Sequence, residues 1–228
     1  MRATLEVCVD APDDLFAAVA AGADRIELCS ALALGGLTPS AGLIEQARQC
    51  SVPVYAMIRP RGGSFCYSEA EICQMEHDIA TMRAAGLAGV VFGALTHDGP
   101  PDVATLQRLI NAAQGLGLTL HRAVDLLSDP VTAVEPAKAL GFERILTSGG
   151  APTAPEGART IARMIAAAGP DIEIMAGSGV TAASVPALHA AGVRSFHASC
   201  SQADADGTRS LNHQALRDLR HAVTSLDQ

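Results

Sequence analysis

A helix-like segment that ends in glycine and is followed by a short apolar run recurs along this sequence. Ala20-Ala21-Gly22 precedes one such run and Ala190-Ala191-Gly192 precedes another. Glycine just past a helix takes the left-handed conformation that a helix-to-strand loop requires. Together with two further runs near the N-terminus, the repeats predict strands at 5–9, 25–29, 54–58, 89–92, 119–121, 144–146, 172–175 and 195–197.

Short strands that alternate with helices predict parallel strands joined by right-handed crossovers. Eight such units close into a (β/α)8 TIM barrel, and 228 residues suit one barrel domain. An open doubly wound sheet is the alternative, but its phosphate fingerprint is missing after the first strand. We therefore expect residues 1–228 to form a single TIM-barrel domain, with helix starts at Thr38, Ser68, Asp129 and Thr181.

The composition narrows the class of protein. Apolar residues make up 49% and charged residues 18% of the chain, enough apolar surface for a large core and too little charge for a disordered chain. The net charge of -8 argues against nucleic acid as a partner, because phosphate contacts need clustered Lys and Arg. No run approaches the roughly 20 apolar residues of a membrane span. We expect a cytoplasmic protein without a signal peptide, whose six cysteines are free thiols.

Two matching triplets stand in the first two predicted strands, Glu6-Val7-Cys8 and Glu27-Leu28-Cys29. Because side chains alternate in a strand, each Glu shares a face with its Cys, and we expect both pairs to point into the barrel. Adjacent strands lie about 4.8 Å apart, so the two thiols are expected near each other at the barrel mouth. Both cysteines as small core residues remain the alternative. The two inward carboxylates need partners, because an unpaired buried carboxylate is costly.

Further charged side chains lie at the ends of later strands, where TIM barrels carry their functional residues. Arg59 follows the third strand, and its guanidinium is expected to hold Glu6 and Glu27 in a buried ion network. His121 and Asp125 follow the fifth strand, and His197 lies in the eighth. This clustering favours one shared site over isolated structural residues.

Two glycine-rich turns follow the sixth and seventh strands. Ser148, Gly149 and Gly150 lie in the first turn, and Gly177, Ser178 and Gly179 lie in the second. Glycine lets backbone N–H groups point at an anion, and a helix starting at Thr181 would add its positive end. The sequence therefore predicts an anion or phosphate site here, although such turns also serve only to reverse the chain.

Together these blocks resemble the CutC family of copper homeostasis proteins. The resemblance runs from the first strand to His197 and covers nearly the whole chain. It is carried by Leu5-Glu6-Val7-Cys8-Val9-Asp10, Gly22-Ala23-Asp24-Arg25-Ile26-Glu27-Leu28-Cys29, Gly35-Gly36-Leu37-Thr38-Pro39-Ser40, Met57-Ile58-Arg59-Pro60-Arg61-Gly62-Gly63-Ser64-Phe65, His121-Arg122-Ala123-Val124-Asp125, Thr147-Ser148-Gly149-Gly150 and Ala176-Gly177-Ser178-Gly179-Val180.

The resemblance implies a cytoplasmic barrel, a homodimer or higher homo-oligomer, that is linked to copper tolerance and binds Cu(I). The cysteines proposed to bind copper in the animal members of the family match Cys8 and Cys29. Thiolates are soft ligands that suit Cu(I), and an inward Met57 or Met175 would add a thioether. On this hypothesis Cu(I) is the cofactor and the partner.

A second hypothesis makes the protein an enzyme acting on a small anionic or phosphorylated metabolite. The glycine-rich turns would hold the anion, and Glu27 or His121 would serve as general base or acid. Arg59 would stabilise developing negative charge. The resemblance favours copper binding, and the polar residues favour the enzyme, so the sequence leaves both hypotheses open.

Overall fold

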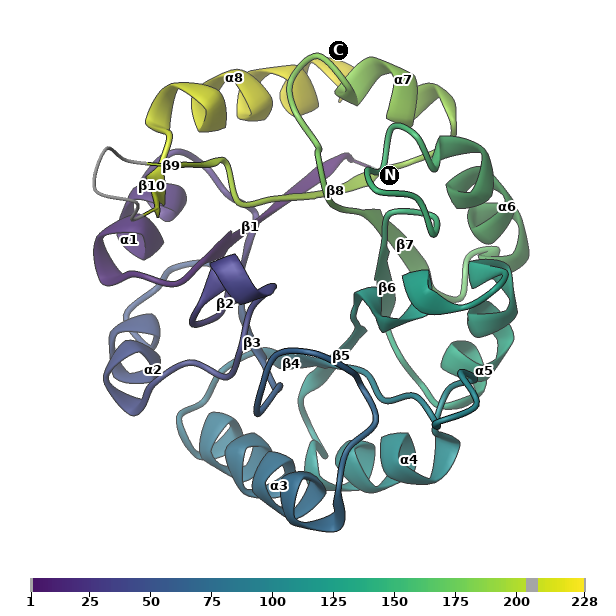
Figure 1. Ribbon diagram of the computed structural model, residues 1–228. Coiled ribbons are helices and arrows are strands. Elements are labelled where there is room, and N and C mark those ends of the chain that lie inside the picture. Colours follow the sequence, from purple (N-terminus) through teal and green to yellow (C-terminus); the bar gives the residue numbers. More distant parts are fainter. Residues whose placement is uncertain (1, 204–208, 228) are drawn as a thin grey trace.

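The computed structural model describes residues 2–203 and 209–227, and eight of their strands form a closed parallel barrel inside a ring of helices (Figure 1). The barrel strands are β1 (Thr4–Val9), β2 (Arg25–Leu28), β3 (Val54–Met57), β4 (Gly89–Phe92), β5 (Gly117–Leu120), β6 (Arg144–Thr147), β7 (Glu173–Ala176) and β8 (Ser195–Ala198). They pair in sequence order, with β8 closing onto β1. The TIM-barrel prediction is confirmed.

The helices occupy the segments between the strands. They are α1 (Pro12–Ala20), α2 (Ala41–Ala47), α3 (Glu69–Ala84), α4 (Val103–Ala112), α5 (Val134–Ala139), α6 (Ala158–Ala168), α7 (Val185–Ala190) and α8 (His213–Thr224). The described residues also form short 3-10 helices, which are η1 (Leu32–Leu34), η2 (Arg122–Leu126), η3 (Pro130–Ala133) and η4 (Ser225–Asp227). A two-stranded antiparallel ribbon, β9 (Ser201–Ala203) with β10 (Arg209–Leu211), follows β8 and was not predicted.

Two of the four predicted helix starts are confirmed. Ser68 forms a capping box with Glu71 at the start of α3, and Asp129 accepts the amide of Val131 at the start of η3. The other two are wrong by a few residues. The cap of α2 is Ser40 rather than Thr38, because Ser40 is the residue whose side chain accepts an amide from the first turn. Thr181 begins a turn, and α7 starts only after Ser184.

Side-chain alternation along the strands separates two apolar layers. One face of each strand packs against the helices and includes Leu5, Ile26 and Leu28. The other face points into the barrel, where Cys29 packs with Tyr55, Met57 and Val91. Ile26 and Cys29 therefore belong to different layers, as the alternation predicted.

Tyr55 fills the barrel near the N-terminal ends of its strands. Its ring passes over Gly89 and Gly117, where a Cβ atom would lie 2.1 Å from Tyr55 Cε1 and 2.1 Å from Tyr55 Oη respectively. The guanidinium carbons of Arg25 and Arg144 lie 5.6 and 4.7 Å from the ring centroid. This end of the barrel is packed, so a site must lie at the other end.

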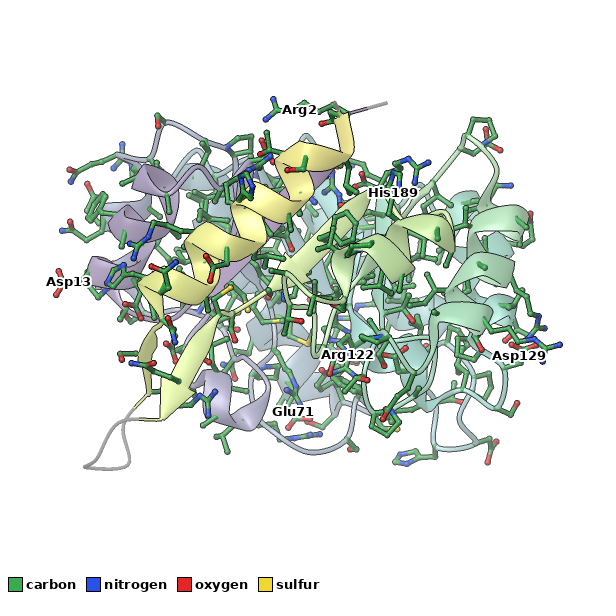
Figure 2. The ribbon with its side chains drawn as sticks, turned by 90° about the horizontal axis from the view of Figure 1, so that it is seen from above. Arg2, Asp13, Glu71, Arg122, Asp129 and His189 are labelled. Carbon is green, nitrogen blue, oxygen red and sulfur yellow. The ribbon has the colours of Figure 1, made fainter. Side chains whose placement is uncertain are left out.

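The loops that follow the strands gather at that other end. Figure 2 shows Arg2, which precedes β1, at one end of the molecule, and Arg122, which follows β5, at the opposite end. Among the residues that the structure describes, no helix is both long and apolar enough to cross a bilayer.

The close approach of Tyr55 predicts a stability difference between two glycines. Gly89→Ala puts a methyl group into the Tyr55 ring and should lower the free energy of unfolding by about 1–3 kcal/mol. Gly42→Ala is the control, because Gly42 lies in α2 with nothing within 4 Å, and alanine there should be neutral or stabilising by up to about 1 kcal/mol. Urea unfolding of the three proteins measures both values. Equal stability of the two variants would contradict the packing described for Tyr55.

Candidate functional site

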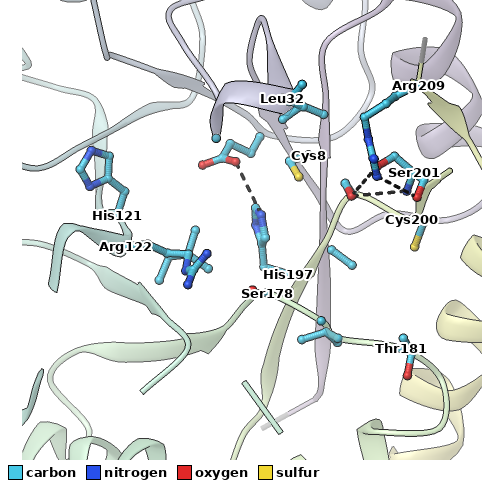
Figure 3. A pocket seen from close by; sticks show the side chains of 18 of the residues that line it. Cys8, Leu32, His121, Arg122, Ser178, Thr181, His197, Cys200, Ser201 and Arg209 are labelled. Carbon is cyan, nitrogen blue, oxygen red and sulfur yellow. Dashed lines mark hydrogen bonds and ion pairs between the residues drawn. The ribbon is translucent and has the colours of Figure 1, made fainter. Parts of the chain in front are cut away.

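A cavity of about 1060 Å³ opens at the C-terminal ends of the strands. Figure 3 shows Cys8, His121 and His197 around it, from β1, the end of β5 and β8. The predicted site residues that line it are Cys8, Glu27, Arg59, His121, Asp125, Ser178, Gly179 and His197. The predicted residues outside its lining are Glu6, Cys29, Ser148, Gly149, Gly150 and Gly177.

Glu6 lies beneath the cavity and has a fully buried side chain. The barrel register sets Arg25 of β2 and His197 of β8 on either side of it. Arg25 Nε donates to Glu6 Oε2, and His197 Nδ1 lies 2.8 Å from Glu6 Oε1. Burial alone would raise the pKa of Glu6, but the charge of Arg25 and the hydrogen bond from His197 outweigh burial and lower its pKa to about 2. Glu6 is therefore ionised, and it fixes the orientation of the imidazole.

The cation that pairs with Glu6 corrects a sequence prediction. We expected Arg59 to hold both carboxylates, but its guanidinium contacts backbone carbonyls, and Arg25 is the arginine that pairs with Glu6. Arg25 was missed although a signal was present. It stands two residues before Glu27 in β2 and therefore points to the same face.

Glu27, Cys8 and His197 form a compact buried group. One ligand atom from each lies within 4.8 Å of the others. His197 Nε2 is 3.6 Å from Glu27 Oε2, while Glu27 Oε1 is buried without a hydrogen-bond partner. Burial raises the pKa of Glu27 to about 7, although the nearby His197 favours its charged form. Burial likewise raises the pKa of the Cys8 thiol, and His197 partly offsets the shift.

The imidazole of His197 has acidic groups on more than one side. Burial disfavours its charged form, but the neighbouring Cys8 and Glu27 and the hydrogen bond to Glu6 raise its pKa well above the ordinary value. With Nδ1 engaged by Glu6, its second nitrogen, Nε2, is left for Glu27, for Cys8 or for a ligand.

Cys29 does not lie opposite Cys8. The register pairs Cys8 with Glu27. Glu27 is the inward-facing residue that precedes Cys29 in the chain, so it lies one inward level below Cys29. The Cys29 thiol donates to Glu27 Oε2 at 3.6 Å, lies outside the cavity lining and packs in the inner apolar layer with Met57. Burial and then the charge of Glu27 raise its pKa well above the ordinary value. The compact group that brings ligand atoms together thus contains Cys8 and not Cys29.

Arg59 lies on another part of the cavity wall and is only 7% exposed. Its Nη1 donates to the carbonyls of Leu34, Gly35 and Gly36, and its Nη2 donates to the carbonyl of Gly63. Its Nε is buried and has no hydrogen-bond partner. Within residues 2–203 and 209–227, no carboxylate oxygen lies within 4.0 Å of its guanidinium nitrogens.

His121 lines the cavity and carries a second buried, unpartnered donor. Its Nδ1 accepts the amide of Ala123 at 3.2 Å, so the ring hydrogen lies on Nε2, which is buried without a partner. Burial and the positive charge of Arg59 lower the pKa of His121 to about 3. His121 is thus a neutral hydrogen-bond donor at physiological pH.

Asp125 occupies the anion site that the first glycine-rich turn was expected to offer. Its carboxylate accepts the amides of Ser148 and Gly150 at 2.9–3.0 Å, and it pairs with Arg122 at 2.8 Å. The amide of Gly149 donates to Thr147 Oγ1. The prediction of a phosphate site in this turn is therefore wrong, because the protein's own carboxylate fills it.

The second glycine-rich turn remains a candidate at two positions. The amide of Gly177 donates to the Thr147 carbonyl within the sheet, whereas Ser178 and Gly179 line the cavity. Ser178 has a positive φ of 75°, and Cys200, also in the lining, has a φ of 48°. Non-glycine residues held in this region store strain, and such strain concentrates at functional sites.

Comparisons with known proteins agree with the fold. A model of the CutC family matches residues 3–202. A family protein CutC of Sinorhizobium medicae is 55% identical over 204 residues, which cover 89% of this chain and 83% of that protein. The corresponding protein of Caulobacter vibrioides is 50% identical over 199 residues, which cover 87% and 81%.

Solved structures give the same picture. A crystal structure of a CutC protein from Streptococcus agalactiae, to which a role in copper homeostasis is ascribed, is 36% identical with a TM-score of 0.82. The match covers 86% of this chain and 98% of that one. A thiamine phosphate pyrophosphorylase from Pyrococcus furiosus is 13% identical with a TM-score of 0.65, over 98% of this chain and 96% of that one, and shares the fold alone.

Removal of the cation beside Glu6 should be costly. Arg25→Met leaves a buried carboxylate without its main partner and should lower the free energy of unfolding by roughly 3–5 kcal/mol. Arg48→Met breaks the exposed pair with Glu45 and should cost less than about 1 kcal/mol. Chemical unfolding at neutral pH compares the two variants, and a small loss for Arg25→Met would refute the role assigned to that pair.

The neutral state of His121 predicts a pH dependence of stability. Its pKa is about 3 in the folded protein, below the ordinary value of 6.5, so the unfolded chain binds the proton first as the pH falls. The stabilising contribution is complete above pH 6.5 and decreases below it. Between pH 7 and pH 5 the wild type should lose about 2 kcal/mol more than His121→Phe. Urea unfolding at both pH values gives the difference, and parallel pH profiles would contradict the assignment.

Proposed function

This chain belongs to the CutC family, and on that premise we propose that it binds Cu(I) through Cys8 and His197 in cytoplasmic copper homeostasis. The observation that carries the proposal is the compact group of Cys8, Glu27 and His197 at the cavity wall. A buried thiol and an imidazole nitrogen are donors that suit Cu(I).

The environment of His197 fits the role of a metal ligand. Glu6 holds Nδ1, which leaves Nε2 as the donor atom, and metal-binding histidines commonly have their second nitrogen fixed in this way by a carboxylate. The unpartnered Oε1 of Glu27 gives the group a third donor atom, an oxygen, or an acceptor for the displaced proton. Binding would release the proton of the Cys8 thiol and the Nε2 proton of the His197 imidazolium, so affinity should fall at low pH.

The family resemblance also points to Cys29 as a second sulfur ligand. The Cys29 thiol and His197 Nε2 both contact Glu27 Oε2. Cys29 is, however, one inward-facing position further along its strand than Glu27, the residue that is paired with Cys8. We therefore assign Cys8 and His197 as the primary ligands. The family resemblance supports a homodimer or higher homo-oligomer, and light scattering at micromolar concentration tests that part of the proposal.

The ligand assignment predicts an order of Cu(I) affinities. Competition with a Cu(I) chelator should show at least a tenfold loss for Cys8→Ser and for His197→Gln, because a hydroxyl and an amide replace a thiolate and an imidazole poorly. Cys29→Ser should bind nearly as well as the wild type. Cys50→Ser is the matched control, because Cys50 lies away from the cavity lining.

The same titration contains the outcomes that would overturn the proposal. Equal affinities in all the variants would remove these residues from any copper site. A loss with Cys8→Ser and Cys29→Ser but not with His197→Gln would establish the two-cysteine site instead. Zn²⁺ binding in clear preference to Cu(I) would refute copper as the ligand, since a Cys, His and carboxylate donor set also suits zinc.

A second candidate function is an enzyme acting on a small anionic metabolite. The observation that favours it is the set of three unpartnered buried atoms in residues that line the cavity: Glu27 Oε1, Arg59 Nε and His121 Nε2. Unpaired buried polar atoms are costly, and a bound substrate would satisfy them. Glu27 supplies the general base, and Arg59 and neutral His121 donate to an oxyanion as it forms.

Proton exchange tests the enzyme directly. If Glu27 removes a proton next to a substrate carbonyl, the wild type should exchange that hydrogen of a small oxo acid such as pyruvate for deuterium in D₂O. Glu27→Gln should slow the exchange at least about 100-fold, because it removes the base and keeps the shape. Proton NMR follows the exchange, with Cys50→Ser as the control. Exchange at the same rate in Glu27→Gln would assign it to another group and reject Glu27 as the base.

A further inference from the structure

We propose that the cavity contains a second ligand site, built by Arg59 and His121, that takes the carboxylate of a small monocarboxylic acid. This site is separate from the group of Cys8, Glu27 and His197, and it goes beyond Cu(I) binding. It also gives the second candidate function a substrate class. Figure 3 shows His121 on the other side of the cavity from Cys8.

The charge of Arg59 is the first argument. A guanidinium that is 7% exposed and has no carboxylate partner among the described residues carries a buried, uncompensated charge. Four backbone carbonyls hold its two terminal nitrogens, which makes the group rigid and leaves Nε–H unpaired. An uncompensated buried charge is expensive, so an anion bound beside it stabilises the protein.

His121 provides the second donor. It is 3% exposed, and its Nε2–H has no partner because the Ala123 amide fixes the hydrogen on that nitrogen. Gly93 makes room for this ring position, since a Cβ there would lie 2.6 Å from His121 Nδ1. The donor is therefore held in place by the surrounding backbone, as in a built binding site.

Phe65 joins the two donors into one unit. Its ring centroid lies 4.7 Å from the Arg59 guanidinium carbon and 4.6 Å from the His121 ring centroid. Both polar groups thus pack on the same aromatic ring, and both residues line the cavity. A carboxylate has two oxygens, one for each of the two unpartnered N–H donors.

The charge balance selects a monoanion over phosphate. Arg59 supplies one positive charge and His121 none, since its pKa is about 3. Arg122, the next cation along the wall, is already paired with Asp125. Phosphate carries about 1.5 to 2 negative charges at neutral pH and would leave an excess of negative charge beside Asp125, whose charge also acts on His121. A carboxylate brings the single charge that the site lacks.

The rim of the cavity indicates which kind of chain the acid carries beside its carboxylate. Leu34 and Leu126 line the mouth and are 60% and 66% exposed, which is high for large apolar side chains. The carbonyl of Leu34 is itself bound by Arg59, so this leucine lies beside the proposed site. A short apolar chain on the acid would cover part of the exposed Leu34 side chain. Butyrate carries such a chain and is therefore a suitable probe.

Titration of the metal-free protein with butyrate and with inorganic phosphate, followed by calorimetry and by NMR of the histidine rings, tests the proposal. We expect wild type to bind butyrate at least tenfold more tightly than phosphate. Arg59→Gln should weaken butyrate at least tenfold, and His121→Phe at least fivefold. His121→Phe leaves Arg59 and its loops untouched, so it decides the matter if Arg59→Gln does not fold.

Arg209→Gln is the control, because Arg209 is an exposed cation that lines the cavity on the side away from His121 (Figure 3) and should leave butyrate affinity unchanged. No butyrate binding, phosphate binding as tight as butyrate, or equal butyrate affinity in wild type and His121→Phe would overturn the proposal. Failure here leaves the Cu(I) titration of Cys8 and His197 unaffected, because that experiment uses other residues and another ligand. If the wild type binds butyrate but does not catalyse the deuterium exchange described above, the enzyme hypothesis is rejected and the carboxylate site is retained.

Discussion

The buried carboxylate of Glu6 is the constraint on which the rest of the site depends. An ionised group away from water costs several kcal/mol unless it is paired, and here Arg25 and His197 pair with it from the two neighbouring strands. The pairing fixes the imidazole of His197, and the imidazole in turn brings Cys8 and Glu27 into one group. The arrangement of the residues at the cavity wall therefore depends on Glu6, which lies one inward level below them.

The barrel divides along its axis into a filled half and an open half. Tyr55 reaches across Gly89 and Gly117 with Arg25 and Arg144 beside its ring, so these side chains fill the barrel interior near the N-terminal ends of its strands. Polar side chains above this plug therefore face a cavity rather than a packed core. Arg25 belongs to both halves, because the same guanidinium packs on Tyr55 and pairs with Glu6.

Within the open half, two chemically different walls share one cavity. Cys8, Glu27 and His197 offer sulfur, oxygen and nitrogen atoms that suit a metal ion. Arg59 and His121 offer N–H donors and a positive charge, which repel a metal ion and attract an anion. The proposed Cu(I) site uses the first wall alone. The second wall, with its unpartnered N–H donors, favours a small organic anion as a further ligand.

The sequence by itself determined the barrel and the direction of the key side chains. Glycine-ended helices fixed the repeat, and strand alternation set the Glu and Cys residues of β1 and β2 on the inner face. The tertiary structure alone decided which of them meet. Alternation tells which face a residue occupies but not its level along the barrel axis, so only the register sets Cys8 beside Glu27 rather than Cys29. The tertiary structure likewise decided that the amides of Ser148 and Gly150 donate to Asp125. The Asp125 carboxylate is more than 20 residues away in the sequence and reaches these amides only in the folded chain.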